Sequence, residues 1–186
     1  MTVALSRFAQ SLRVETAFTV LAVARALKAG GKDVVELEIG DSPFDSTAAA
    51  KTAGIEAIQH NHSHYCPSPG LPEFREAAAR FVSREFGIPA TAANVVVGPG
   101  AKVFEQFFCE AFLNPGDGVL VFSPYFPTYL PNIERRGARA VLSPLRQADG
   151  FRPDVAAIER FLADDPAPRA ILLNSPHNPT GGVTTD

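Results

Sequence analysis

The sequence predicts an α/β fold, with a mostly parallel sheet that carries helices on both faces. Short apolar segments alternate along the chain with longer segments whose apolar residues recur at helical spacing. Strands that alternate with helices of this length form βαβ units, in which the strands run parallel. The chain has 186 residues, of which 46% are hydrophobic, so it can bury a core of this kind.

The individual elements follow from apolar periodicity and from the residues that end each segment. A helix over residues 14–29 ends at Gly30, in the manner of a glycine C-cap. A helix over residues 73–86 follows Pro72, which suits a first helical turn, and stops at Gly87. In chain order we expect helix 14–29, strand 34–39, helices 48–60 and 73–86, strand 94–97, helix 103–113, strand 119–122, a helix ending at 136, strand 138–142, helix 153–163 and strand 169–173.

Ligands of open parallel sheets bind beyond the carboxyl ends of the strands, so the loops at that edge are the first candidates for a site. The turn Gly98-Pro-Gly-Ala-Lys102 follows the strand predicted at 94–97 and opens a helix. The unpaired amides and the dipole of a helix N-terminus favour an anion there, above all a phosphate. The turn matches neither the P-loop nor the dinucleotide fingerprint, and a turn kept only for packing is an equal alternative.

Two further loops bring an aromatic ring and a neutral amide to the same edge. Ser123-Pro-Tyr-Phe126 follows the strand at 119–122, where an aromatic ring can stack on a planar ligand; core packing is the alternative. Asn178 stands between two prolines after the last strand, and its amide can hydrogen-bond an oxyanion; an ordinary turn is the alternative. A flat, phosphorylated aromatic cofactor satisfies the phosphate turn, the ring and the amide together.

The bulk composition excludes several classes of partner. A net charge of −3 with dispersed Lys and Arg predicts that the chain binds no nucleic acid. No apolar run is long enough to cross a bilayer, so we expect no membrane partner. Cys66 and Cys109 do not make a disulfide framework, which favours a reducing, cytoplasmic location.

Three histidines alternate in the segment His60-Asn-His-Ser-His64. On a strand this spacing places three imidazoles on one face, where they could bind a metal ion. No cysteine or acidic residue lies at ligand spacing from them, and a polar loop explains the segment better. We therefore expect no metal site.

The motifs and their order resemble the N-terminal half of the class I/II aminotransferases, pyridoxal-phosphate enzymes of the aspartate aminotransferase fold. The resemblance implies the three-layer α/β/α, mostly parallel sheet of the PLP-dependent transferase major domain, incomplete here, with an N-terminal segment belonging to a small domain. Residues 1–45 are then the N-terminal arm and small-domain segment, and residues 46–186 the first part of the large PLP-binding domain. The resemblance rests on Gly40, Tyr65 to Arg75, Gly100-Ala-Lys102, Asn114-Pro-Gly-Asp117, Ser123-Pro-Tyr-Phe126 and Asn174-Ser-Pro-His-Asn-Pro-Thr-Gly181.

The resemblance also implies how the chain holds pyridoxal 5'-phosphate. Backbone amides at Ala101 and Lys102, after Gly100, are expected to cradle the phosphate. Phe126 is expected to stack on the pyridine ring, where relatives often carry Trp. Asn178 is expected to hydrogen-bond the oxygen of the ring hydroxyl.

Two more roles implied by the resemblance concern the substrate and a second subunit. Gly40 is expected near the α-carboxylate of the substrate. Tyr65 is expected to reach across a homodimer interface to the phosphate bound by the partner subunit. The substrates implied are an amino acid and a 2-oxo acid, between which an amino group is transferred.

No residue of the chain matches the Schiff-base lysine of the family, which lies well downstream of the Asn-Pro-Thr-Gly loop. The candidates Lys28, Lys32 and Lys51 lie on or beside helices away from the predicted site, and Lys102 lies beside the predicted phosphate. The Asp that pairs with the pyridine nitrogen and the Arg that clamps the substrate carboxylate are also unmatched. We therefore expect a fragment of a longer enzyme, with no catalytic residue in this chain, inactive and poorly stable by itself.

An aminotransferase is the leading hypothesis, and three alternatives stay open at this point. A lyase or decarboxylase-like enzyme can share the fold. A regulator can use an aminotransferase-like domain to sense pyridoxal phosphate. The chain can also be a non-catalytic protein, or one half of a split enzyme completed by a second chain.

Overall fold

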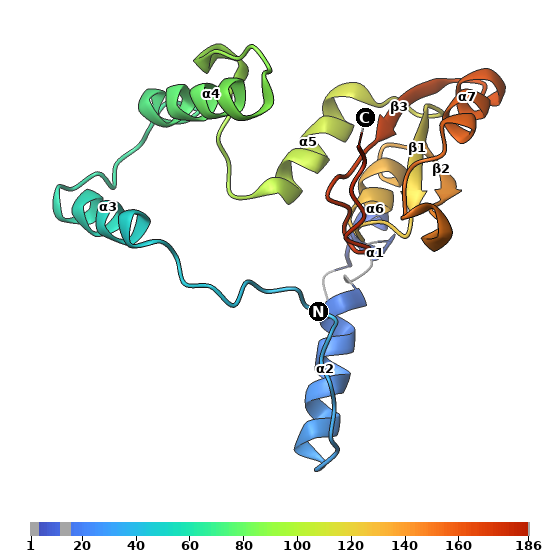
Figure 1. Ribbon diagram of the computed structural model, residues 1–186, viewed down its shortest axis with the longest axis horizontal. Helices are drawn as coiled ribbons and strands as arrows, with labels where there is room; N and C mark the ends of the chain where they lie inside the picture. The colour runs from blue at the N-terminus through green and yellow to red at the C-terminus, as the bar shows by residue number, and fades with distance from the viewer. Residues whose placement is uncertain (1–3, 12–15, 186) are drawn as a thin grey trace. The chain divides into compact units, whose positions relative to one another are not determined.

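A computed structural model describes residues 4–11 and 16–185 (Figure 1). By their internal contacts the residues group into two compact units, Met1–Ile39 with Lys102–Asp186, and Gly40–Ala101. The domain boundary predicted between residues 45 and 46 stays a prediction. The helices are α1 Arg7–Ser11, α2 Thr16–Ala29, α3 Ala48–Gln59, α4 Pro72–Phe86, α5 Ala101–Phe112, α6 Tyr129–Glu134 and α7 Val155–Asp164, with short 3₁₀ helices η1 Ala92–Asn94 and η2 Gln147–Asp149.

A three-stranded parallel sheet forms the centre of the first unit. Its strands are β1 Gly118–Ser123, β2 Arg139–Pro144 and β3 Pro168–Leu172, in the order β2-β1-β3. Both neighbours of β1 run parallel to it, and Leu120 pairs with Val141 on one side and Ile171 on the other. The continuous apolar run of β1 is typical of a central parallel strand, because both of its faces are covered.

The two faces of β1 bury different clusters, as expected from the alternation of side chains along a strand. Val119 and Val121 pack on one face with Cys109 of α5 and Ile133 of α6. On the other face, the partners of Leu120 and Phe122 include Leu145 and, on α7, Phe161. The predicted α/β/α layering with a parallel sheet is therefore confirmed.

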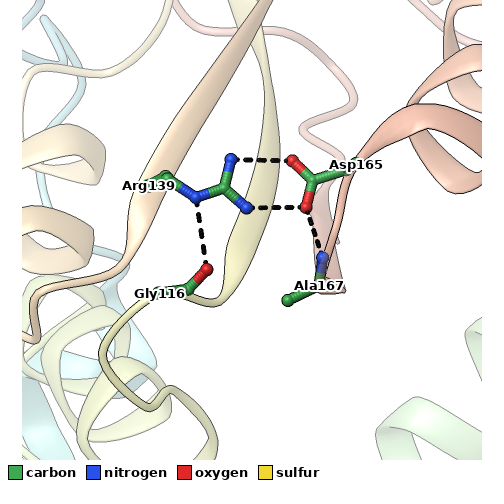
Figure 2. Close-up of polar contacts among 4 residues, drawn as sticks. All are labelled: Gly116, Arg139, Asp165 and Ala167. Carbon is green, nitrogen blue, oxygen red and sulfur yellow. Dashed lines mark hydrogen bonds and ion pairs between the residues drawn. The ribbon is translucent and has the colours of Figure 1, made fainter.

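A charged fork closes the amino end of the sheet (Figure 2). Arg139, at the start of β2, donates from both terminal nitrogens to the Asp165 carboxylate at 2.7 and 2.9 Å and from Nε to the Gly116 carbonyl at 3.2 Å. The Ala167 amide donates to the same carboxylate at 2.9 Å. Gly118 leaves the room that this carboxylate needs, because a Cβ there would lie 2.5 Å from its oxygen.

The unit Gly40–Ala101 is held by contacts between α4 and the segment after it. Arg75 on α4 donates to the carbonyl oxygens of Val95, at 2.8 Å, and of Ala92. α4 ends as predicted, with a left-handed C-cap residue at Gly87, φ 65°.

Two predicted strands are wrong. Residues 34–39 and 94–97 have no assigned strand, and the described residues provide no neighbouring strand for either of them. A strand is held by hydrogen bonds to a neighbour, so an apolar pattern without one leaves an extended segment with exposed side chains, such as Leu37 at 88%. The other predicted strands and helices form, with shifts of a few residues; α5 begins at Ala101 rather than at residue 103.

Candidate cofactor site

Two loops leave the carboxyl edge of the sheet next to each other. β1 and β3 are parallel neighbours, and Val121 pairs with Leu172 close to their ends. The loop with Phe126 follows β1, and the loop with Asn178 follows β3. The sheet therefore directs both loops to the edge at which parallel α/β proteins bind ligands.

The loop after β3 is held by its own hydrogen bonds. Asn174 Oδ1 accepts a hydrogen bond from the backbone N–H of Asn178 at 2.7 Å. The backbone N–H of Gly181 donates to the His177 carbonyl at 2.7 Å, and the backbone N–H of His177 donates to the Gly182 carbonyl at 2.8 Å. The peptide bond between Asn178 and Pro179 is cis. The Asn178 side chain is exposed and makes no hydrogen bond within the described residues, so its amide is available to a ligand.

His177, the residue before Asn178, is buried. The residue is 8% exposed, and Nδ1 lies 2.9 Å from Thr180 Oγ1. The ring also lines a cavity of about 10 Å³, which has room for about one water molecule. Burial lowers the pKa of His177 below its ordinary value. The sequence indicates no role for His177, because the segment Pro176-His-Asn-Pro179 has the composition of a surface turn.

Lys102 and Phe126 are brought together. The ammonium of Lys102, in the first turn of α5, lies 5.2 Å from the centre of the Phe126 ring. The Phe126 ring contacts Tyr129 edge to face, with 5.9 Å between ring centres. A cation and an aromatic platform at one place are what a phosphorylated planar ring requires, so these residues fit pyridoxal phosphate.

The start of α5 has the geometry of an anion-binding turn. Gly100 has φ 99°, a left-handed conformation that glycine adopts without strain, and its amide bonds to the Gly98 carbonyl at 2.9 Å. Ala101 and Lys102 follow at the first turn, where backbone amides have no acceptor inside the helix. The donor set therefore suits a phosphate.

Glu105 connects α5 with the segment before α6, and the sequence reasoning missed it. Its carboxylate accepts a hydrogen bond from the Thr128 hydroxyl. Burial, and then the charge of Glu105, raise the pKa of Tyr129 and of Cys109. The only signal in the sequence was the spacing of Glu105 and Cys109 by one helical turn. A cavity of about 200 Å³ lies beside this group, lined by Glu105, Phe108, Cys109, Tyr129, Asn132 and Leu172.

Gly40 and Tyr65 lie in the unit Gly40–Ala101, and both are exposed. The position of this unit relative to the sheet is not determined (Figure 1). The roles expected of Gly40 and Tyr65, at the substrate and across a subunit interface, therefore stay predictions.

The three alternating histidines do not lie on a strand. His60 caps the end of α3, and His62 and His64 follow in the loop. In residues 4–11 and 16–185 no group of three or more His, Cys, Asp or Glu side chains could hold a metal ion. Over the same residues, no helix is both long and apolar enough to span a membrane.

The sequence matches known proteins over nearly its whole length. The family model described as aminotransferase class I and II matches residues 32–186. The chain is 35% identical to the aspartate/prephenate aminotransferase of Thermus thermophilus over 181 residues, 96% of this chain and 46% of that enzyme. The chain spans about half the length of the curated relatives it matches.

Solved structures give the same result. Aspartate aminotransferase from Thermus thermophilus with maleate superposes with a TM-score of 0.89 at 35% identity, covering 98% of this chain and 47% of that one. Alanine aminotransferase from Pyrococcus furiosus superposes with a TM-score of 0.88 at 31% identity, covering 97% and 46%. Sequence and fold agree, and the chain belongs to the class I and II aminotransferases, a pyridoxal-phosphate-dependent family.

Proposed function

We propose that this chain is part of an aminotransferase that moves an amino group between an amino acid and a 2-oxo acid, with pyridoxal 5'-phosphate as its cofactor. The family match over residues 32–186 supports the class of reaction. The observation that carries the cofactor site is the contact of Lys102 with Phe126 at 5.2 Å, at the sheet edge that also leads into the Asn178 loop.

The proposed roles follow from the chemistry of each group. The amides of Ala101 and Lys102, after the left-handed Gly100, bind the phosphate at the start of α5. Phe126 stacks on the pyridine ring, a contact of about 0.5–1.5 kcal/mol beyond burial. The Asn178 amide donates to the ring hydroxyl oxygen and holds its negative charge. When bound, the cofactor supplies an electron-withdrawing ring that stabilises negative charge at the substrate carbon.

A homodimer and a cytoplasmic location complete the proposal. The exposed ring of Tyr65 is assigned to the phosphate of the partner subunit, and Gly40 to the substrate carboxylate. The free thiols of Cys66 and Cys109 suit a reducing compartment.

We further propose that residues 1–186 alone do not catalyse transamination. Proton transfer at the substrate carbon needs a lysine, and none of the four lysines of this chain matches the Schiff-base lysine of the family. Lys28 pairs with Glu36 at 3.2 Å and Lys51 with Asp45 at 3.0 Å, while Lys102 lies over Phe126.

The test uses the full-length protein that the gene encodes. We expect it to bind pyridoxal 5'-phosphate, with a new absorbance band, and to transfer an amino group from an amino acid to a 2-oxo acid. Release of ammonia or carbon dioxide without amino transfer would assign a lyase or decarboxylase instead. Cofactor binding without any reaction would contradict the enzymatic role and leave a sensor, and turnover by the isolated 186-residue chain would contradict the proposed inactivity.

A further inference from the structure

The buried ring of His177 is hydrogen-bonded inside the loop that presents Asn178. Nδ1 lies 2.9 Å from Thr180 Oγ1, and the same oxygen accepts from the Gly182 amide at 3.2 Å. The backbone of His177 is also hydrogen-bonded to the backbone of Gly181 and Gly182, so the ring and the main chain of His177 both hold the segment that follows Asn178.

The hydrogen bonds favour one form of the imidazole. In the neutral ring with the proton on Nε2, Nδ1 accepts from the Thr180 hydroxyl while Thr180 Oγ1 accepts from the Gly182 amide. Nδ1, the Thr180 hydroxyl and the Gly182 amide then each have a matched partner. In the protonated ring, Nδ1 also carries a hydrogen, so the Thr180 hydroxyl hydrogen loses its acceptor.

Among the described residues that line the cavity beside the ring, no side chain carries a negative charge that would compensate an imidazolium. The small cavity beside His177 is lined by Phe122 of β1, Leu172 of β3, Tyr129 of α6 and the loop residues Leu145, Phe151, Pro153, Asn174 and Thr184. Tyr129 is the only titratable side chain in that set, and burial keeps it protonated by raising its pKa. None of these described lining residues carries a carboxylate.

We infer that His177 is a positioning residue: its neutral imidazole, bonded to Thr180, fixes the loop that holds the Asn178 amide against the cofactor ring. This inference rests on the proposed function for the identity of the ligand. The loop loses this support on protonation. Since the pKa of His177 is lower in the fold than its ordinary value of 6.5, the stabilisation is complete above that value and declines as the pH falls through it.

The first readout does not depend on the cofactor. Hydrogen exchange of the backbone amides in residues 174–185 of the full-length protein, expressed as protection factors, is measured at about pH 8 and about pH 5.5. We expect the protection to fall by about fivefold in acid, the effect of losing roughly one hydrogen bond. In His177→Asn the amide oxygen takes the place of Nδ1 without titrating, so the loop stays protected at both pH values.

Two substitutions of Thr180, the hydrogen-bond partner of His177, complete the set of variants. Thr180→Val keeps the shape and removes the hydroxyl, so the loop is less protected at both pH values, while the burial of His177 still gives an acid response. Thr180→Ser keeps the hydroxyl and retains the response of the wild type. Affinity for pyridoxal 5'-phosphate, titrated on the same proteins, is expected to fall about fivefold more in acid for the wild type than for His177→Asn.

The outcomes separate the inference from the function on which it rests. Equal acid responses of loop protection in wild type and His177→Asn would overturn the inference, whether or not the cofactor binds. If the acid response of loop protection depends on His177 but the protein binds no pyridoxal 5'-phosphate, the proposed function is overturned. The role of the His177–Thr180 hydrogen bond in fixing the loop is then still supported. A cofactor that binds with the same pH dependence in both proteins would overturn the positioning role.

Discussion

The two ends of the parallel sheet differ in how their polar groups are used. At the amino end, the Asp165 carboxylate accepts hydrogen bonds from the Arg139 guanidinium and from the Ala167 amide (Figure 2). Gly118 leaves the space that this carboxylate needs. At the carboxyl end, within the described residues, the Asn178 side chain is exposed and makes no hydrogen bond.

The difference indicates that the amino end of the sheet stabilises the fold and that the carboxyl end binds a ligand. Groups that satisfy one another inside the fold hold the strands in register, and a ligand has nothing to bind there. The exposed Asn178 amide, in a loop that follows the strand next to the one leading to Phe126, has donors that a partner outside the chain can use. Substitutions at the amino end should therefore change stability, and those at the carboxyl end should change affinity for the cofactor.

The largest effect is expected for Gly118→Ala in the full-length protein. The new Cβ would lie 2.5 Å from Asp165 Oδ1 and push the carboxylate out of the fork. We expect a loss of about 3 kcal/mol in the free energy of unfolding, measured by urea denaturation. Gly54→Ala is the control, since its Cβ meets nothing within 4 Å inside helix α3 and alanine favours a helix. Equal effects of the two substitutions would show that the space at Gly118 is unimportant.

The next effect concerns affinity. Asn178→Ala removes the amide assigned to the ring hydroxyl oxygen, and we expect pyridoxal 5'-phosphate to bind about tenfold more weakly, as for a hydrogen bond to a charged group. Asn114→Ala is the matched control, an exposed asparagine just before β1 at the opposite end of the sheet. A loss of affinity in the control as large as in Asn178→Ala would refute the assignment of the site to the carboxyl end.

A smaller effect is expected for the Lys102 and Phe126 contact. Lys102→Met, Phe126→Leu and the double variant form a mutant cycle on affinity for pyridoxal 5'-phosphate and on unfolding. We expect a coupling of about 0.5–1 kcal/mol in unfolding, typical of an exposed cation over a ring, and a loss of affinity for each single variant. Lys51→Met breaks an exposed ion pair with Asp45 and should leave cofactor affinity unchanged. Unchanged affinity in both single variants would remove these residues from the site.

The smallest effect expected is a change, in acid, of the stability that Asp165 contributes at the amino end. The hydrogen bond from Arg139 holds the pKa of Asp165 below its ordinary value of 3.8. The contribution of this carboxylate to stability is therefore complete above that value and is lost as the pH falls through the lower pKa of the fold. The difference in unfolding free energy between the wild type and Asp165→Asn should shrink as the pH is lowered past 3.8. A difference that does not change with pH would exclude the ionised pair as its source.

The sequence predicted the central layers of the fold because they depend on local patterns. The apolar run of β1 and the helical spacing of α5 and α7 are visible within ten or so residues, and these elements form. The strands expected at residues 34–39 and 94–97 depend on a neighbour, which a local pattern does not reveal, and they do not form.

The site shows the same limit. Loop composition and position along the chain predict that Asn178 and the turn at Gly100 lie in loops outside the strands, as they do, and their cofactor roles stay predictions. The burial of His177, the bond from Thr128 to Glu105 and the Arg139–Asp165 fork were missed, since each depends on packing between segments or on the path of a loop. Arg139 and Asp165 are 26 residues apart, and no spacing rule connects them.

The division between the two ends is tested most directly by measuring both properties on two variants of the full-length protein, Asn178→Ala and Asp165→Asn, at neutral pH. We predict that Asn178→Ala binds pyridoxal 5'-phosphate more weakly with an unchanged urea midpoint in the absence of cofactor. We predict that Asp165→Asn unfolds at lower urea and binds the cofactor as the wild type does. If Asp165→Asn loses affinity while Asn178→Ala keeps it, the cofactor site is not at the carboxyl end of the sheet and the account is wrong.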